Sequence, residues 1–312
     1  MSALRVSAPV ADALRDGRPV VALESSVLAQ GLPIPANREA AERMMAAVER
    51  AGAVPAITAV VRGVATLGIT EEELERFLAR AGVLKVSARD LPVAIAKKAD
   101  GATTVAASLC LAGAMHVEVF ATGGIGGVHR DAPFDESADL AELARTPMIV
   151  VCAGAKSILD LPATLERLET LGVAVVGYRT DELPGFFTRS TGLQLTARAD
   201  AVEDIVAMHR ASRALGRPQA TLVVQPPPAD VALPFDLIDG AVTAALAEAR
   251  RAGVRGAAVT PFLLNAVLGA TEGRSLAANL GLLDANAELA GRIAAVLAGD
   301  AGASARVNTN GG

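Results

Sequence analysis

Met148-Ile149-Val150-Val151-Cys152 is an uninterrupted apolar run, and Ala153-Gly154-Ala155-Lys156 follows it directly. A short apolar run without polar alternation is typical of a strand that helices cover on both faces. The stretch therefore predicts a buried strand with a single lysine just beyond its carboxyl end.

Other short runs have the same apolar character and recur along the whole chain. They are Val20–Leu23, Ala56–Val61, Val117–Ala121, Ala174–Gly177, Thr221–Val224 and Ala257–Val259. Longer amphipathic segments separate them, and alternating strands and helices indicate a parallel or mixed sheet with helices on both faces. We therefore predict an α/β protein of three layers, α/β/α.

The predicted helices have recognisable ends. Asn37 can cap a helix that ends before Gly52, and Thr70 with Glu73 forms a capping box for the next one. Pro162 suits the first turn of a helix that stops at Gly172. The predicted helices are 38–50, 70–80, 162–171, 199–215, 235–251 and 275–297.

We find no internal repeat and no Ser/Gly linker, so residues 1–299 are expected to form a single catalytic domain. Residues 300–312 are small and polar, which predicts a disordered tail. The two cysteines, Cys110 and Cys152, lie in apolar stretches without zinc-type spacing, and we expect buried free thiols.

Composition excludes several classes of partner. The net charge is -5 and the basic residues are scattered, which argues against nucleic-acid binding. No segment has the roughly 20 consecutive apolar residues of a membrane span. The N-terminal segment 1–16 lacks the pattern of a signal peptide, so we expect a cytoplasmic protein.

Two charged side chains lie within or just after predicted strands. Glu24 ends the run that starts at Val20, where burial would favour the protonated form and proton donation; pairing with an arginine or capping a helix is the alternative. Lys85 lies among apolar neighbours. It could hold a phosphate or a carbonyl, or it could be a solvated edge lysine.

A glycine-rich stretch, 120–130, precedes a cluster of acids. Its four glycines let the backbone approach a ligand, and their amides can form an anion-binding nest. Asp135, Glu136 and Asp139 follow, and such oxygen ligands suit Mg²⁺ or Mn²⁺. Ser137 could equally cap the next helix, and both roles are compatible.

Lys156 carries the sharpest chemical hypothesis. It follows a dry strand, and we expect it to open a helix, where low polarity and the positive helix end favour the neutral, nucleophilic amine. The alternative is a phosphate-binding lysine without a covalent role.

Taken together, these stretches resemble the pseudouridine-5′-phosphate glycosidases, the family that includes the indigoidine synthase A proteins. The resemblance runs in order from about Val20 to Asn279. Its stretches are 23–26, 31–37, 86–92, 100–106, 120–130, 137–140, 152–160, 177–182, 259–264 and 275–279.

The resemblance implies a reaction and a fold. The reaction is the reversible cleavage of the C–C bond of pseudouridine 5′-phosphate, which gives uracil and ribose 5-phosphate. It belongs to pseudouridine catabolism. The activity is also classed as a hydro-lyase (pseudouridylate synthase). A carbon leaving group needs an electron sink at C1′, and a lysine imine of the opened sugar supplies one. The resemblance also implies a mixed central sheet and a homotrimer.

The resemblance further implies roles for individual residues. Glu24 moves a proton at the ring oxygen and Lys156 attacks C1′, while Asp135 ligates Mn²⁺ or another divalent cation such as Mg²⁺. The implied substrate-binding residues are Lys85, Val105, Ser137, Ala138, Asp139 and Asn279.

Two points stay open at the level of sequence. Glu136 could compete with Asp135 for the metal, and the choice between Asp135 and Asp139 as the direct ligand is not settled. This chain also has Gln30 where family members often have histidine.

Other functions fit parts of the pattern. A Schiff-base lysine also suits a sugar-phosphate aldolase, and a glycine-rich loop with acids suits a carbohydrate kinase. A non-catalytic sugar-phosphate sensor would bind without turnover. Release of free uracil from pseudouridine 5′-phosphate would distinguish a glycosidase from the aldolase, the kinase and the sensor.

Overall fold

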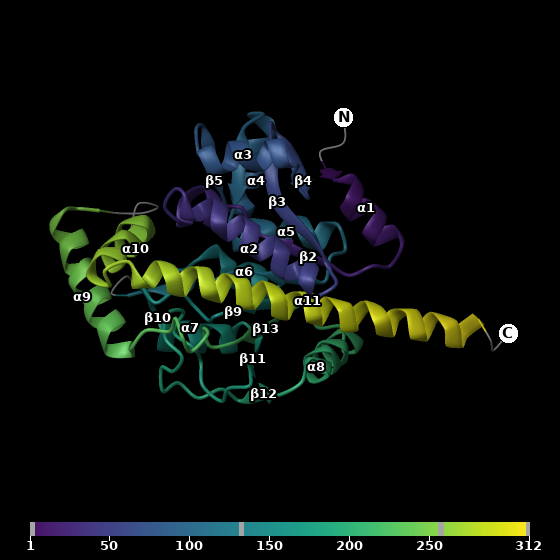
Figure 1. The fold of residues 1–312 in the computed structure, drawn as a ribbon. Coiled ribbons are helices and arrows are strands. Elements are labelled where there is room, and N and C mark those ends of the chain that lie inside the picture. The colour runs from purple at the N-terminus through teal and green to yellow at the C-terminus, as the bar shows by residue number, and fades with distance from the viewer. Residues whose placement is uncertain (1–3, 131–133, 255–258, 310–312) are drawn as a thin grey trace.

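The structure, a computed structural model, describes residues 4–130, 134–254 and 259–309, without the side chains of 260, 261 and 300–309. One mixed sheet of eleven strands runs through this part of the chain. Its main path is β1-β4-β3-β2-β7-β9-β13-β11-β12, and β6 joins β3 and carries β5 (Figure 1). The predicted α/β class with a mixed sheet is confirmed.

The strands of this sheet are short. They are β1 (Leu4–Val6), β2 (Val20–Leu23), β3 (Val54–Val61), β4 (Val64–Leu67), β5 (Val83–Val86), β6 (Asp100–Thr103), β7 (Val119–Ala121), β9 (Ile149–Cys152), β11 (Ala174–Tyr178), β12 (Ala197–Ala199) and β13 (Thr221–Val224). A separate antiparallel pair consists of β8 (Val128–His129) and β10 (Leu159–Asp160).

The centre of the sheet is parallel. β2 pairs with β3 and β7, and β9 pairs with β7 and β13, all in parallel. β2, β9 and β13 are buried along their whole length, as continuous apolar runs predict. The strand predicted at Ala257–Val259 lies mostly outside the described residues, and its last residue, Val259, begins helix α10.

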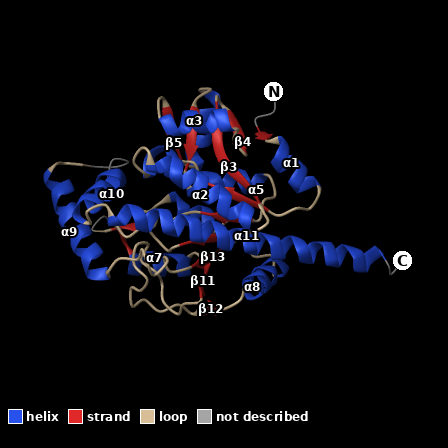
Figure 2. Cartoon of the chain, viewed as in Figure 1, coloured by secondary structure: helices blue, strands red, loops and turns tan. Residues whose placement is uncertain are grey.

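Helices cover both faces of the sheet (Figure 2). On one face α11 crosses the sheet and packs against α2 and α8, whereas α5 packs with α6 on the other face. The helices are α1 (Ala8–Arg15), α2 (Ala36–Arg50), α3 (Glu71–Ala79), α4 (Leu91–Ala96), α5 (Val105–Ala114), α6 (Ala138–Leu143), α7 (Leu161–Thr170), α8 (Val202–Ala214), α9 (Phe235–Arg251), α10 (Val259–Ala270) and α11 (Arg274–Thr309).

Two predicted helix ends differ from the structure. Asn37 lies inside α2, and its side chain donates to the carbonyls of Leu28 and Leu78 instead of capping the helix. The C-terminal helix α11 continues past Leu297 to Thr309 and so enters the range expected as a disordered tail. Side chains beyond residue 299 lie outside the described residues, so the predicted disorder of the tail stays a prediction.

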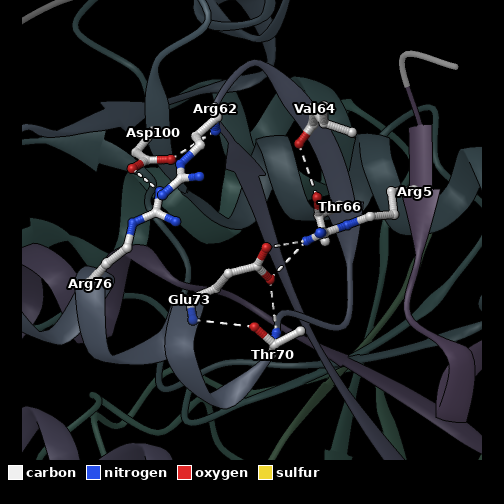
Figure 3. Close-up of polar contacts among 8 residues, drawn as sticks. All are labelled: Arg5, Arg62, Val64, Thr66, Thr70, Glu73, Arg76 and Asp100. Carbon is white, nitrogen blue, oxygen red and sulfur yellow. Dashed lines mark hydrogen bonds and ion pairs between the residues drawn. The ribbon is translucent and has the colours of Figure 1, made fainter. Parts of the chain in front are cut away.

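The capping box at α3 is present as predicted and is part of a wider network (Figure 3). Thr70 and Glu73 exchange hydrogen bonds, and both Glu73 oxygens also accept from Arg5 at 2.7 Å. Asp100 accepts the Arg62 backbone N–H at 2.7 Å and pairs with Arg76. The network ties β1, α3 and β6 together, and β6 supports the strand that carries Lys85.

The mixed part of the sheet brings two strand ends together. β2 pairs with the first half of β3 in parallel, and β6 pairs with the second half in an antiparallel direction. The carboxyl ends of β2 and β6 therefore meet beside Thr58. Buried hydroxyls join them: Ser25 Oγ donates to the Thr58 carbonyl at 2.7 Å and accepts the Thr103 N–H at 2.9 Å.

Within the described residues, no helix combines the length and apolar character that crossing a membrane requires. Cys152 is buried as predicted, but Cys110 is exposed, because its face of α5 is turned toward solvent.

Candidate active site

Glu24, Lys85 and Lys156 line one cavity at the carboxyl ends of β2, β5 and β9. The cavity has two lobes that share these three side chains and Ser26. The polar lobe, about 120 Å³, also contains Ser87, Thr104, Val105, His129, Ser137 and Asp139. The apolar lobe also contains Val27, Gln30, Gly124, Phe186, Leu264 and Asn279.

Glu24 lies directly after β2 and is only 4% exposed. Its two carboxyl oxygens accept hydrogen bonds from the hydroxyls of Ser26 and Thr122. Neither a helix cap nor an arginine pair of Glu24 is present among the described residues, so both alternatives considered for it are unsupported. Two hydroxyls hold the carboxyl group in place while it faces the cavity.

Lys156 reaches the cavity from an irregular loop. Its N–H donates to the Ile125 carbonyl at 3.1 Å, and Ala155 bridges to Ile125, so the loop lies against the glycine-rich stretch. The prediction that Lys156 opens a helix is wrong. α7 begins five residues later, at Leu161, because Asp160 accepts the Ala163 N–H and caps it.

Arg130 forms hydrogen bonds with the backbone of the loop that carries Lys156. Its guanidinium donates to the carbonyls of Ser157 at 3.2 Å and Leu159 at 3.0 Å, and it pairs with Asp239 of α9 at 2.8 Å. The described cavity of greatest volume, about 560 Å³, lies beside this arginine and contains neither Glu24 nor Lys156. The cavity that contains Glu24, Lys85 and Lys156 is therefore the candidate active site because of its side chains and not because of its volume.

Lys85 lies near the end of β5 and is exposed to solvent while it also lines the cavity. Partial burial lowers the pKa of its ammonium group, and the charge of Lys156 lowers it further, while Glu24 and Asp139 act in the opposite direction. Lys85 is thus an exposed residue of an outer strand that also lines the cavity, and the solvated edge lysine stays a valid alternative to substrate binding.

The acids that follow the glycine-rich stretch do not form one cluster. Glu136 pairs with Arg167 at 2.9 Å. Asp139 is buried, and its two oxygens accept the N–H groups of Ala106 at 2.9 Å and Gly126 at 2.8 Å. No group of three or more His, Cys, Asp or Glu side chains suited to a metal occurs in the part of the chain that the structure describes.

Asp135 differs from its two neighbours. Its carboxylate is exposed and makes no hydrogen bond or ion pair with the other described residues, while its backbone carbonyl accepts the N–H of His129, a residue of the polar lobe. Asp135 is not among the residues that line either lobe, whereas Asp139 lies in the polar lobe but its oxygens already accept two amides.

One backbone N–H of the glycine-rich stretch is bonded within the protein, and the predicted anion-binding nest stays a prediction. The Gly126 N–H is used by Asp139, and a side chain at Gly126 would collide with Ser137 and Asp139. Ser137 caps α6 by accepting the Asp139 N–H at 3.2 Å and also lines the cavity, while its role as a ligand stays a prediction. The glycine-rich stretch therefore packs closely against residues 137–139.

Most residues proposed from the sequence reach the cavity. Val105 and Asp139 lie in the polar lobe, and Asn279 of α11 lies in the apolar lobe. Ala138 is exposed in the first turn of α6 and is not among the side chains that line either lobe.

Sequence reasoning missed several side chains that the fold adds. They are Ser26, Ser87, Thr104, Thr122, His129 and Phe186. Ser26, Ser87, Thr104 and Thr122 follow β2, β5, β6 and β7, so their position after a strand was the available signal.

Comparison with known proteins identifies similar chains over almost the full length. The family model described as indigoidine synthase A like protein matches residues 9–296. A protein of Gemmatimonas aurantiaca named pseudouridine-5′-phosphate glycosidase is 68% identical, covering 94% of this chain and 96% of its own. One of the same name from Herpetosiphon aurantiacus is 50% identical, covering 95% and 99%.

Two solved structures are also similar. The prealnumycin C-glycosynthase AlnA, in complex with ribulose 5-phosphate, has a TM-score of 0.89 at 38% identity, covering 96% of this chain and 98% of that one. An indigoidine synthase A-like protein of Thermotoga maritima has a TM-score of 0.87 at 36% identity, covering 95% and 96%.

Proposed function

Because this chain belongs to the indigoidine synthase A-like family, we propose that it cleaves pseudouridine 5′-phosphate, with water, to uracil and ribose 5-phosphate. The observation that carries the proposal is the convergence of Glu24, Lys85 and Lys156 on one cavity. Curated relatives named pseudouridine-5′-phosphate glycosidase support the substrate, and AlnA supports a sugar phosphate.

We propose that the reaction begins with ring opening. Glu24, held by Ser26 and Thr122, gives its proton to the ring oxygen as Lys156 Nζ attacks C1′. The C1′–N bond forms, the C1′–O4′ bond breaks, and the attacking amine returns a proton to Glu24. Close placement of nucleophile and proton donor is what such a step requires.

Carbon–carbon cleavage follows from the lysine adduct. The nitrogen lone pair forms the C1′=N bond, the electrons of the C1′–C5 bond pass to uracil C5, and C5 takes the proton from Glu24. Water then adds to the imine with loss of a proton to Glu24, and collapse releases ribose 5-phosphate and free Lys156. The imine is the electron sink that a carbon leaving group needs.

The polar lobe is the proposed phosphate site. Lys85 offers a cation, and the hydroxyls of Ser87, Thr104 and Ser137 offer donors. Thr104 caps α5, and Val105, the first residue of this helix, lines the same lobe, where Asp139 already accepts the Ala106 N–H. This placement directs the sugar C1′ toward Lys156 and the base toward the apolar lobe.

We further propose a divalent cation, Mn²⁺ or Mg²⁺, at Asp135. Its available carboxylate supports this choice over Asp139. When bound, the cation would neutralise phosphate charge, and the remaining ligands would be water or substrate oxygens, as hard cations prefer. No step assigned above to Glu24 or Lys156 depends on it.

A cytoplasmic homotrimer with a single catalytic domain is the proposed physiological form. Exposed apolar side chains on the surface support association, namely Ile34, Leu84 and Val93. Sedimentation equilibrium tests the trimer directly.

The decisive experiment is incubation with pseudouridine 5′-phosphate and Mn²⁺, followed by chromatography for free uracil. Equimolar uracil and ribose 5-phosphate are expected. Consumption of ATP would indicate a kinase, C–C cleavage of a sugar phosphate without a base would indicate an aldolase, and binding without turnover would indicate a sensor.

A further inference from the structure

Lys156 begins a turn that lies between two cavities. The Leu159 N–H donates to the Lys156 carbonyl at 3.0 Å, so residues 156–159 form a β-turn. Leu159 lines the polar lobe and also the cavity of about 560 Å³ outside the candidate active site. The turn is therefore part of the wall between two cavities, where fewer atoms pack against it than in the core of the protein.

One arginine side chain bonds to the backbone of this turn. Arg130 Nε donates to the Leu159 carbonyl at 3.0 Å, and its Nη2 donates to the Ser157 carbonyl at 3.2 Å. On the other side of the lysine, the Lys156 N–H donates to the Ile125 carbonyl at 3.1 Å. Arg130 thus holds the backbone that follows Lys156, as the glycine-rich stretch holds the backbone that precedes it.

Asp239 orients the guanidinium of Arg130. The remaining donor, Arg130 Nη1, lies 2.8 Å from Asp239 Oδ1 on α9, and both side chains are partly buried. A guanidinium carries its donors in a rigid planar fork, so it can serve two carbonyls and one carboxylate at the same time. An ammonium group is a compact charge on a flexible stem. The three acceptors around Arg130 therefore need an arginine and not merely a positive charge.

We propose that Arg130, oriented by Asp239, is a positioning residue that holds the turn so that Lys156 Nζ reaches C1′ of the sugar. This rests on the proposed function, in which Lys156 is the nucleophile. Both residues of the pair line the outer cavity, and neither is among the described residues that line the two lobes. The pair therefore acts through the backbone of the turn and does not touch the substrate.

The test separates the rate of covalent bond formation from sugar-phosphate binding. Arg130→Lys is mixed with ribose 5-phosphate at a series of concentrations, and borohydride added at increasing times fixes the adduct for mass spectrometry. A misplaced reacting group loses rate and not affinity, so the maximal rate of adduct formation and kcat should fall about tenfold or more, while the half-saturating concentration changes less than about twofold.

Asp239→Asn tests the other half of the pair. It keeps the size of the side chain and removes its charge, so the maximal rate should fall in the same way, but less than in Arg130→Lys. The double variant should be no slower than Arg130→Lys alone, because both changes disturb one contact. If Arg130→Lys does not fold, Asp239→Asn gives the same comparison from a partly exposed position on α9.

Arg198→Lys is the matched control. Arg198 also pairs with carboxylates, those of Asp181 and Asp200, but it lies on the outermost strand β12, and its change should leave every constant as it was. An unchanged maximal rate in Arg130→Lys, or a loss that appears only as a higher half-saturating concentration, overturns the role of Arg130 alone. An unchanged enzyme that forms no adduct on Lys156 overturns the proposed nucleophile as well.

Discussion

Lys85 and Lys156 line the same cavity, where burial lowers the pKa of Lys85 and the charge of Lys156 lowers it further. A lysine with a lowered pKa loses its positive charge at a lower pH than a free lysine. The proposed phosphate ligand is therefore sensitive to alkaline conditions.

The first prediction concerns this alkaline sensitivity. Binding of a phosphate needs the charged form of Lys85, so kcat/KM should fall on the alkaline side below the ordinary lysine pKa of 10.5. Lys85→Arg should move the fall to higher pH, because guanidinium stays protonated. The exposed Lys97→Arg serves as the matched control. If kcat/KM falls at the same alkaline pH in Lys85→Arg and in the unchanged enzyme, Lys85 does not bind the phosphate.

The second prediction is a covalent imine on Lys156. Borohydride added during turnover should fix a ribose-phosphate adduct, and peptide mass mapping should place it on the peptide that contains Lys156. Lys156→Arg should bind sugar phosphate but form no adduct, since guanidinium is not nucleophilic at neutral pH. An adduct on Lys85, or near-normal turnover by Lys156→Arg, would show that Lys156 is only a phosphate ligand.

The third prediction concerns Glu24. Glu24→Gln keeps the shape of the side chain between Ser26 and Thr122 but removes the transferable proton. Turnover should fall by about 10²–10⁴-fold while the melting temperature changes little. Glu49→Gln, an exposed site on α2, is the control. A loss under about threefold, far below that expectation, would leave Glu24 with a structural role.

The fourth prediction concerns the cation. EDTA should abolish uracil release and Mn²⁺ should restore it, because Asp135 offers an exposed carboxylate, unpaired among the described residues, two residues before Ser137 of the polar lobe. Asp135→Asn should weaken Mn²⁺ binding about tenfold or more by calorimetry. Glu136→Gln should not, since Glu136 pairs with Arg167. Full turnover in metal-free buffer would refute the requirement.

The fifth prediction concerns stability in acid. Burial lowers the pKa of His209 from 6.5 to about 4, and Arg213 and Arg210 add nearby positive charge. Between these pH values the unfolded state binds a proton that the folded state does not. The contribution of His209 to the free energy of unfolding should therefore be complete above pH 6.5 and be lost as pH falls toward about 4.

Urea unfolding between pH 4 and 7.5, with linear extrapolation to zero urea, measures this contribution. The difference in stability between the unchanged protein and His209→Gln should shrink as the pH falls. His116→Gln, at an exposed position, should show a constant difference. A constant difference for His209→Gln as well would mean that His209 does not couple folding to protons.

The sequence by itself determined those strands and helices that a run of neighbouring residues is enough to predict. The apolar runs at Val20–Leu23 and Thr221–Val224 and the helix at Phe235–Arg251 have the bounds that composition and periodicity predict. α5 was not predicted, because it is apolar on all sides and has no distinct face. The ordered motifs around Glu24 and Lys156 also predicted the family.

Only the tertiary structure decided how these residues meet. β2 and β6 run in opposite directions along β3, so their carboxyl ends face each other and place Glu24 near Thr104 and Lys85. No local signal predicts such pairing, because strand partners are chosen by contacts between distant segments. For the same reason the sequence could not show that Gln30 and Asn279 share a lobe, since one follows β2 and the other belongs to α11.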